Sequence, residues 1–197
     1  MPQQTIPLFP LKTVLFPGGP LPLRIFEMRY LDMISRCLRE GIEFGVVAIR
    51  GGSETGAAAL HTVGTGARIV DWYQGSDGLL GITALGEKRF SLDSVETQHD
   101  GLHVGHCKWI QPDPRVPIPD EYAPLGRMLE DVMCDLGHHY QIVETRFGDA
   151  SWVGNRLAEI LPIGIERKQV CLELNDPIER LAMLRPLLQA VREESKE

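Results

Sequence analysis

Short apolar segments separated by glycine-rich turns fill the first half of the chain, and this pattern is typical of β-strands. The apolar runs at 46–49 and 80–85, for example, have the length of strands rather than of helices. Asp-Gly pairs at 77–78 and 100–101 supply the two positive-φ residues that a tight two-residue hairpin turn requires. These features predict a closed or nearly closed antiparallel barrel.

One helix is predicted among these strands. Its apolar residues recur at helical spacing, and Gly41 suits a C-terminal stop. The apolar positions are Phe26, Tyr30, Leu31, Ile34 and Leu38. The sequence therefore predicts a β-rich module with one inserted helix.

A proline-rich joint at 111–119 separates this module from the rest of the chain. Proline fixes φ and removes a backbone donor, so we interpret the joint as a linker. Beyond it the apolar period becomes helical. The residues predicted to begin helices are Asp120, Asp149 or Ser151, Ile165 and Asp176, with Pro177 at a first helical position. The predicted fold class is α+β, with a β-rich module at 1–112 and a helical bundle at 113–197.

The charge of the chain argues against nucleic acid as a partner. The net charge is −7 and the isoelectric point is near 5.4, whereas a protein that neutralises phosphates needs a cationic surface. Residues 1–112 are nearly neutral, with 10 basic and 11 acidic side chains. No apolar run reaches the roughly 20 residues that cross a bilayer, and no secretory signal is visible. We therefore expect a cytoplasmic protein that does not contact a membrane.

The sequence contains none of the common catalytic loops. A P-loop, a Gly-x-Ser-x-Gly elbow and a His-Glu-x-x-His helix are absent from the sequence. We therefore expect a protein that is not an enzyme and that binds no cofactor. The one cluster with metal-ligand side chains comprises His99, His103, His106 and Cys107. His103 and His106 lie three positions apart on a predicted strand and would point to opposite faces, so we expect no metal.

The most unusual segment is the apolar, proline-rich stretch at 6–23. Its five prolines argue against a continuous central strand or helix. One interpretation is that short extended pieces of this segment cover the core of a barrel. The other is that it leaves an open strand edge and apolar surface that accept an extended peptide.

Several short motifs of the chain resemble the N-terminal, substrate-binding domain of Lon, the ATP-dependent protease. In the first module the similar segments are 7–10, 14–18, 22–27, 63–69 and 86–90. In the second module they are 161–163, 166–173 and 176–181. The resemblance implies a PUA-like pseudo-barrel followed by a helical bundle, in agreement with the two modules predicted from the residue pattern.

The resemblance also implies a function in binding. Lon continues into ATPase and Ser-Lys protease domains, whereas this sequence ends at Glu197, so we expect a stand-alone bacterial protein without ATP or peptide hydrolysis. The leading hypothesis is a protein-interaction module that recognises exposed apolar or extended segments of other polypeptides, so its partners would be unfolded or extended polypeptides. Aromatic anchors would supply most of the binding energy. The candidate contacts are Phe16, Pro17, Leu21, Trp72, Tyr73 and Phe90.

Three alternatives stay open at this point. The first is RNA binding, because PUA-like barrels also bind RNA and basic side chains could converge in the first module. These side chains are Arg24, Arg29, Arg36, Arg39 and Arg68. The second is a small-molecule or metal pocket in the barrel near His99 and Cys107. The third is a regulator of a full-length protease, and the sequence makes no prediction about oligomeric state.

Overall fold

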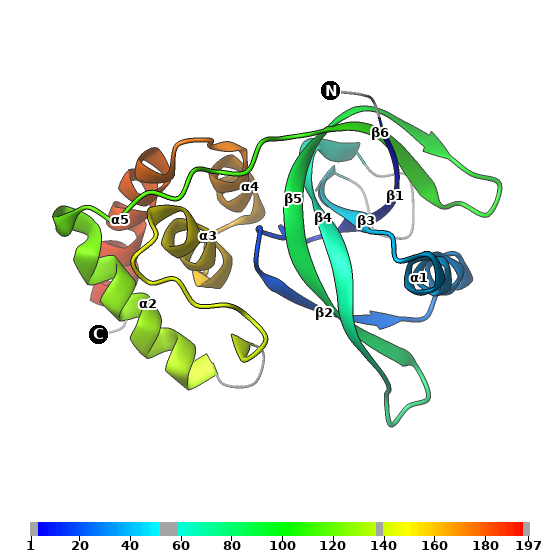
Figure 1. Ribbon diagram of the computed structural model, residues 1–197, viewed down its shortest axis with the longest axis horizontal. Helices are drawn as coiled ribbons and strands as arrows, with labels where there is room; N and C mark the ends of the chain where they lie inside the picture. The colour runs from blue at the N-terminus through cyan, green and yellow to red at the C-terminus, as the bar shows by residue number, and fades with distance from the viewer. Residues whose placement is uncertain (1–3, 52–58, 137–139, 195–197) are drawn as a thin grey trace. The chain divides into compact units, whose positions relative to one another are not determined.

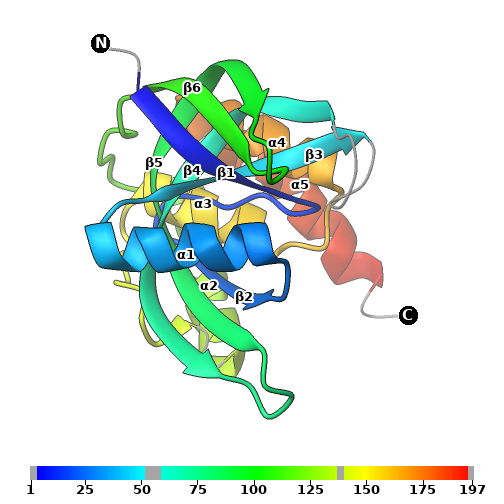
Figure 2. The ribbon, with the colours of Figure 1, turned by 90° about the vertical axis from the view of Figure 1, so that its right-hand side faces the viewer.

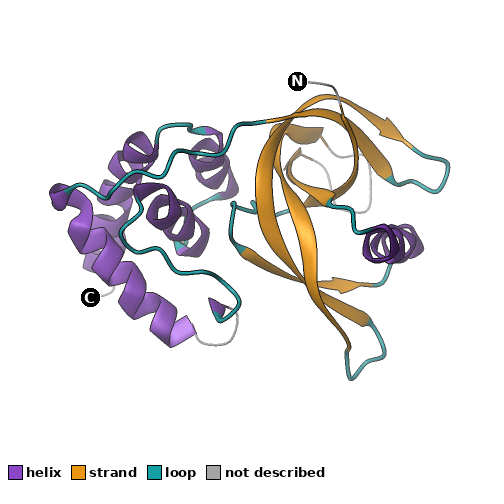
Figure 3. Ribbon diagram, viewed as in Figure 1, coloured by secondary structure: helices purple, strands orange, loops and turns teal. Residues whose placement is uncertain are grey.

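The computed structural model of the chain describes residues 4–51, 59–136 and 140–194. The chain divides into two units, Met1–Gln111 and Pro112–Glu197. The described part of the first unit contains β-strands and helix α1, and that of the second contains helices α2 to α5 (Figures 1 and 3).

The strands of the first unit form one mixed sheet that closes on itself. They are β1 (Gln4–Leu11), β2 (Pro20–Ile25), β3 (Phe44–Gly51), β4 (Ala59–Gln74), β5 (Leu80–Thr97) and β6 (His103–Trp109). The strand order is β2-β5-β4-β3-β1-β6, and an additional β5–β6 pairing completes a ring from which only β2 is left out. The predicted closure is therefore present.

The prediction that all strands are antiparallel is wrong for one pair. β1 and β3 run parallel, whereas the other pairs are antiparallel. β2 and α1 lie between β1 and β3 in the sequence, and such a crossover connection lets the chain return in the same direction. The sequence pattern shows short strands but not this change of direction.

β1 lies between two strands although it contains Pro7 and Pro10, contrary to the sequence-based expectation. β6 pairs with the first part of β1, up to Leu8, and β3 pairs with the part from Leu8 to Leu11. Each proline therefore has a neighbouring strand on one side only, and its missing N–H breaks no ladder hydrogen bond. The segment contributes Ile6, Phe9 and other apolar side chains to the core, so it covers the core instead of forming an open edge.

Both predicted hairpins are present, with longer turns than expected. Gly78 and Gly101 have φ of 80° and 84°, whereas no described residue other than glycine has positive φ. In each turn the N–H of the glycine donates to the carbonyl three residues earlier, and the preceding aspartate accepts a hydrogen bond from the backbone N–H two residues after it. The turns are three-residue loops that end in a left-handed glycine.

Helix α1 (Met28–Glu40) ends as predicted at Gly41, whose φ is 65° and whose N–H donates to the carbonyl of Cys37. Its buried side chains are Tyr30, Met33, Ile34 and Cys37, which pack with residues of β1 to β5 in one core cluster. The Tyr30 ring stacks on Phe9 of β1 at a centroid distance of 4.0 Å. Figure 2 shows α1 lying across the strands. Phe26 and Leu38, predicted on the buried face, are 64% and 44% exposed, because the face turned to the sheet is centred on Tyr30 and Ile34.

The second unit contains helices α2 (Ala123–Leu136), α3 (Ala150–Ile160), α4 (Ile165–Glu173) and α5 (Pro177–Glu194). Asp149 caps α3 by accepting a hydrogen bond from Ser151 N, and Asp176 accepts one from Ile178 N at the start of α5. Asp120 does not cap α2, since a 3₁₀ turn at Asp120–Tyr122 precedes that helix. In the described ranges, no helix has the length and apolar character needed to cross a membrane.

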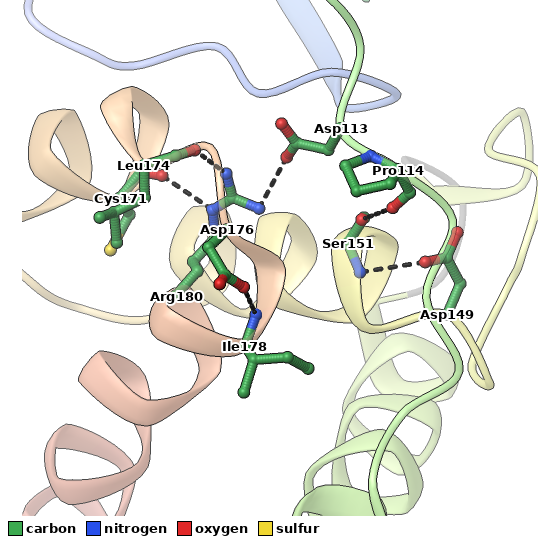
Figure 4. Close-up of polar contacts among 9 residues, drawn as sticks. All are labelled: Asp113, Pro114, Asp149, Ser151, Cys171, Leu174, Asp176, Ile178 and Arg180. Carbon is green, nitrogen blue, oxygen red and sulfur yellow. Dashed lines mark hydrogen bonds and ion pairs between the residues drawn. The ribbon is translucent and has the colours of Figure 1, made fainter.

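From Pro112 on, the proline-rich joint is part of the second unit rather than a free linker. Ala150 N donates to the carbonyl of Val116 (2.8 Å), and Ile118 N donates to the carbonyl of Gly148 (2.9 Å). The Arg180 guanidinium, with no exposed side-chain area, forms an ion pair of 2.8 Å with Asp113. It also donates to the carbonyls of Cys171 and Leu174 at the end of α4 (Figure 4). These contacts replace the backbone pairing that the prolines cannot provide.

Candidate functional site

The second half of β4 forms an open strand edge. β3 pairs with β4 only as far as Ala67, whereas β5 continues to pair with β4 to Gln74. Within the described ranges, no strand pairs with residues 68–74 on the side away from β5. We call residues 68–74 the β4 edge, and Figure 2 shows the hairpin that contains it extending past α1.

Two large aromatic side chains are exposed on the β4 edge, one on each face. Trp72 is 63% exposed and Tyr73 is 48% exposed. Trp72 lies opposite Ile82 of β5, a core residue, so it continues the face of the sheet that is buried elsewhere. Tyr73 lies on the other face, because successive side chains of a strand alternate. An extended chain placed along this edge would therefore meet an aromatic ring on either face.

The position of the Tyr73 ring depends on a glycine on the neighbouring strand. It lies opposite Gly81, which is buried, and a Cβ atom at Gly81 would collide with the Tyr73 ring. The ring therefore covers the backbone of β5 where that strand has no side chain. Such an aromatic–glycine pair fixes the direction of the tyrosine on an otherwise exposed strand.

The hydrogen bonds at the end of the hairpin show which backbone groups face outward. Gly75 N donates to the carbonyl of Leu79 (2.8 Å), so the amide of Gly75 faces β5. Because inward and outward amides alternate, those of Trp72 and Gln74 face away from β5. Trp72 N accordingly donates to Oδ1 of Asp71 at 2.9 Å. The outward amide of Trp72 is capped by the carboxylate of its own neighbour.

The second open edge of the sheet, strand β2, is a poor template for strand pairing. β2 pairs only with β5 among the described strands, so its second side is also open. Pro20 and Pro22 lie at alternate positions of β2 and have no N–H to donate. Because a proline nitrogen in a paired strand faces the open side, two outward donors of β2 are missing. The β4 edge contains no proline.

The structure separates the six predicted contact residues into three groups. Phe16 and Phe90 have no exposed area and are core residues, so neither ring is available to a partner. Pro17 and Leu21 are partly buried, and Leu21 packs against the core beneath α1. Trp72 and Tyr73 alone lie together on an exposed surface.

Phe90 shows why an aromatic residue near a predicted turn can be a core residue. Its ring packs edge-on against Trp109 at 5.9 Å. A Cβ atom at Gly64 would lie 2.6 Å from Cζ of Phe90 and 2.5 Å from the Val46 carbonyl oxygen. The ring occupies the space that this glycine leaves inside the sheet, and no such packing can be deduced from a single sequence.

The exposed apolar residues that are not among the predicted contacts include Val70, Phe26 and Met28, at 37%, 64% and 69%. Val70 belongs to the β4 edge and lies where the register with β5 shifts between Ile69 and Asp71. This shift marks a β-bulge, in which one residue has no partner on the next strand. Val70 follows Ile69 in an apolar pair, and this pair is the only sequence signal for the bulge.

Four of the five arginines considered for RNA form ion pairs with carboxylates. Arg24 pairs with Asp77, Arg29 with Glu27 (2.7 Å), Arg39 with Glu40 (3.5 Å) and Arg68 with Glu87 (2.7 Å). Arg36 lines a polar cavity of about 260 Å³ with Arg29 and Arg39, beside Asp32 and Asp100. These acidic neighbours reduce the positive potential on which phosphate binding depends.

The histidines of the predicted metal-type cluster interact with other partners. His103 Nδ1 lies 3.0 Å from Thr97 Oγ1, and His106 Nε2 lies 3.1 Å from Glu96 Oε1. Burial and the nearby Arg29 lower the pKa of His103. In the part of the chain that the structure describes, no three His, Cys, Asp or Glu side chains are grouped as metal ligands. Burial also raises the pKa of the thiol of Cys37 to about 11, so this thiol is a poor nucleophile at neutral pH.

The second unit contains an apolar cavity of about 310 Å³ between α2, α3 and α5. All its lining side chains are apolar, among them Met128, Leu157 and Leu188. The cavity offers no polar group that could orient a ligand, in contrast to the β4 edge, where backbone donors and aromatic rings occur together.

Comparison with known proteins gives one consistent result. The family model described as the ATP-dependent protease La (LON) substrate-binding domain matches residues 5–190. Lon protease 2 of Myxococcus xanthus is 27% identical over 199 residues, which cover 96% of this chain and 24% of that protein. Lon protease of Anaeromyxobacter dehalogenans is 36% identical over 90 residues, which cover 44% of this chain and 11% of that protein. The chain thus spans a quarter or less of the length of these two relatives.

Solved structures also resemble most of the chain, among them the following two. The crystal structure of a Lon N-terminal domain protein from Xanthomonas campestris is 35% identical, with a TM-score of 0.78 and coverage of 93% of this chain and 98% of that one. The N-terminal domain of the Mycobacterium avium complex Lon protease is 17% identical, with a TM-score of 0.62 and coverage of 92% and 96%. The second similarity concerns the fold alone.

Proposed function

The chain belongs to the family of the Lon substrate-binding domain, and we propose that it binds exposed apolar or extended segments of other polypeptides without catalysing a reaction on them. The observation that carries this proposal is the pair Trp72 and Tyr73, exposed on adjacent positions of an open strand edge. Large aromatic side chains bury much area at low entropic cost, so they are suited to anchor a polypeptide.

The finer features of the fold are part of the same proposal. We assign the closed sheet with α1 to the PUA-like pseudo-barrel type, with a module at 1–112, and the helices of 113–197 to a helical bundle. We also place the protein in the cytoplasm, where unfolded polypeptides expose apolar segments. The ion pairs of Arg24 and Arg68 with carboxylates favour polypeptide over RNA as the partner.

Binding to an unfolded client tests the proposal. Fluorescence anisotropy of a labelled, permanently unfolded model protein, such as a reduced and carboxymethylated one, is compared with that of the same protein in its folded form. We expect the unfolded client to bind and the folded one not to. Equal affinity for the two forms would refute the proposal.

A pair of matched variants locates the site. Trp72→Ala combined with Tyr73→Ala removes both anchors and should weaken client binding at least about tenfold, which corresponds to about 1.4 kcal/mol. Ile142→Ala, at a side chain that is 48% exposed in the second unit, is the control and should bind like the wild type. Undiminished binding by the double variant would place the site elsewhere.

A further inference from the structure

We propose that the β4 edge binds its client by strand addition, so that an extended polypeptide segment becomes an additional strand beside β4. This inference rests on the proposed function and specifies how the same site recognises its partner. It predicts that backbone hydrogen bonds, and not aromatic contacts alone, hold the client. Binding would then depend little on the exact sequence of the client, as a substrate-recognition module requires.

The length and access of the edge suit a short extended segment. The edge comprises the seven residues 68–74, of which all except Ile69 are exposed. At about 3.3 Å per residue, this edge is about 23 Å long. A client segment that pairs along the whole edge must be extended over the same length. Unfolded polypeptides offer such segments, whereas a folded client exposes few of them.

The backbone groups needed for pairing are present on this edge. Trp72 and Gln74 direct their amides away from β5, and their carbonyls face the same way because a residue presents both groups on one side of a strand. β2, the alternative open edge, lacks two of these donors at Pro20 and Pro22. The difference between the two edges identifies β4 as the one that can hold a client strand.

The exposed aromatic rings define which client residues fit. Side chains of the added strand alternate between the Trp72 face and the Tyr73 face. On the first face, Trp72 continues the apolar row formed by Ile82 and Leu23. On the second face, Tyr73 lies on the same side as Asp71 and as Arg24 and Arg68, whose charges pair with Asp77 and Glu87. We expect clients with bulky apolar residues at every second position, and with polar residues between them.

The charge of Asp71 favours a client strand over a second copy of this chain. The carboxylate of Asp71 caps Trp72 N and is exposed. Antiparallel pairing of two copies around Trp72 would place the two Asp71 side chains on the same face at diagonal positions, about 7–8 Å apart, and like charges on paired strands are unfavourable. A client strand without acidic residues opposite Asp71 avoids this repulsion.

Backbone methylation of a peptide tests strand addition. The probe is a fluorescent seven-residue peptide with valine or phenylalanine at alternate positions, measured by anisotropy against the unaltered protein. Two further peptides carry N-methyl groups, one at the odd positions and the other at the even positions. Only one set of amides in an added strand faces β4, so we expect one peptide to lose at least about tenfold in affinity and the other less than about threefold.

The outcomes separate this inference from the function on which it rests. Binding of the parent peptide with equal effects of the two methylation patterns would overturn strand addition and leave polypeptide recognition intact. Failure of the parent peptide and of the unfolded client to bind would overturn both. A dimer in analytical ultracentrifugation that the parent peptide dissociates would show that a second copy occupies the edge, and this would contradict the proposed occupant.

A variant of the protein provides an independent test. Gln74→Pro removes one outward N–H, as Pro20 and Pro22 do on β2, and leaves the pairing with β5 intact. We expect this variant to keep its circular dichroism spectrum and to bind the parent peptide at least about fivefold more weakly. Gln74→Ala keeps the N–H and should bind within about twofold of the wild type. Equal binding by the two variants would overturn strand addition.

Discussion

The ring of Tyr73 on β4 covers the backbone of Gly81 on β5, so the exposed tyrosine is held by a residue that has no side chain. Gly81→Ala should push the ring away while changing the free energy of unfolding by less than about 1 kcal/mol, because the displaced group is the far end of an exposed side chain. We therefore expect weaker client binding, measured by anisotropy, with little change in melting temperature.

A matched control is Gly51→Ala at the end of β3, where an added Cβ meets no atom of the described residues within 4 Å. This variant should match the wild type in both measurements. If Gly81→Ala bound the client as well as Gly51→Ala does, Tyr73 would not be an anchor.

The cap on the edge predicts a variant with increased binding. Asp71→Ala frees the outward N–H of Trp72, which otherwise donates to the Asp71 carboxylate at 2.9 Å. In the variant, a client strand can accept from Trp72 N without first breaking the hydrogen bond to Asp71. We therefore expect peptide affinity to rise by about two- to tenfold. Titration calorimetry with the alternating peptide measures the change. Lower affinity of the variant would show that the carboxylate contacts the client directly.

The same variant should also associate with itself more readily. Removal of Asp71 eliminates the repulsion between two copies of the edge, and exposed strand edges pair with one another when charges are absent. Sedimentation velocity over a range of protein concentrations measures the self-association. Asp93→Ala on β5 is the control and should associate no more than the wild type.

Core and site aromatics should differ sharply in their effect on stability. Phe90 is fully buried, so Phe90→Ala should reduce the free energy of unfolding by roughly 3–5 kcal/mol. Trp72 is 63% exposed, so Trp72→Ala should change it by at most about 0.5–1 kcal/mol while weakening client binding. Urea unfolding followed by circular dichroism makes the comparison. A large loss of stability for Trp72→Ala would mean that its ring is structural.

The buried ion pair of Arg180 and Asp113 should stabilise the second unit. Arg180→Met removes the charge that pairs with the Asp113 carboxylate, which is 8% exposed. We expect the free energy of unfolding to fall by about 3–5 kcal/mol, because removing one partner of a buried ion pair is strongly destabilising. Hydrogen exchange measured by mass spectrometry should show faster exchange in α3 to α5. Arg185→Met, which removes the exposed pair with Glu121 at 3.4 Å, should have little effect.

Local turn and cap signals account for the parts of the fold that could be predicted from the sequence. Gly41, Asp149 and Pro177 determine helix ends through their own backbone chemistry, so their positions are readable without tertiary information. The two Asp-Gly turns are located in the same way, although their length depends on the twist of the strands that they connect.

The remaining features depend on contacts between distant segments. The parallel pairing of β1 and β3 and the change of partner strand at Leu8 are properties of the whole sheet. Burial of Phe90 requires the space left by Gly64 on another strand. Trp72 and Tyr73 could be singled out as aromatic residues near a turn, but the open edge beside them exists only because β3 stops pairing at Ala67.

Amide hydrogen exchange with and without client tests the central claim most directly. The wild-type protein is saturated with the alternating peptide, and exchange of individual amides is followed by NMR. We expect the amides of Trp72 and Gln74, which face outward, to exchange at least about tenfold more slowly when the peptide is bound, since each then donates to the added strand. Unchanged exchange at these two amides, with protection appearing in the apolar cavity between α2, α3 and α5 instead, would contradict client binding at the β4 edge.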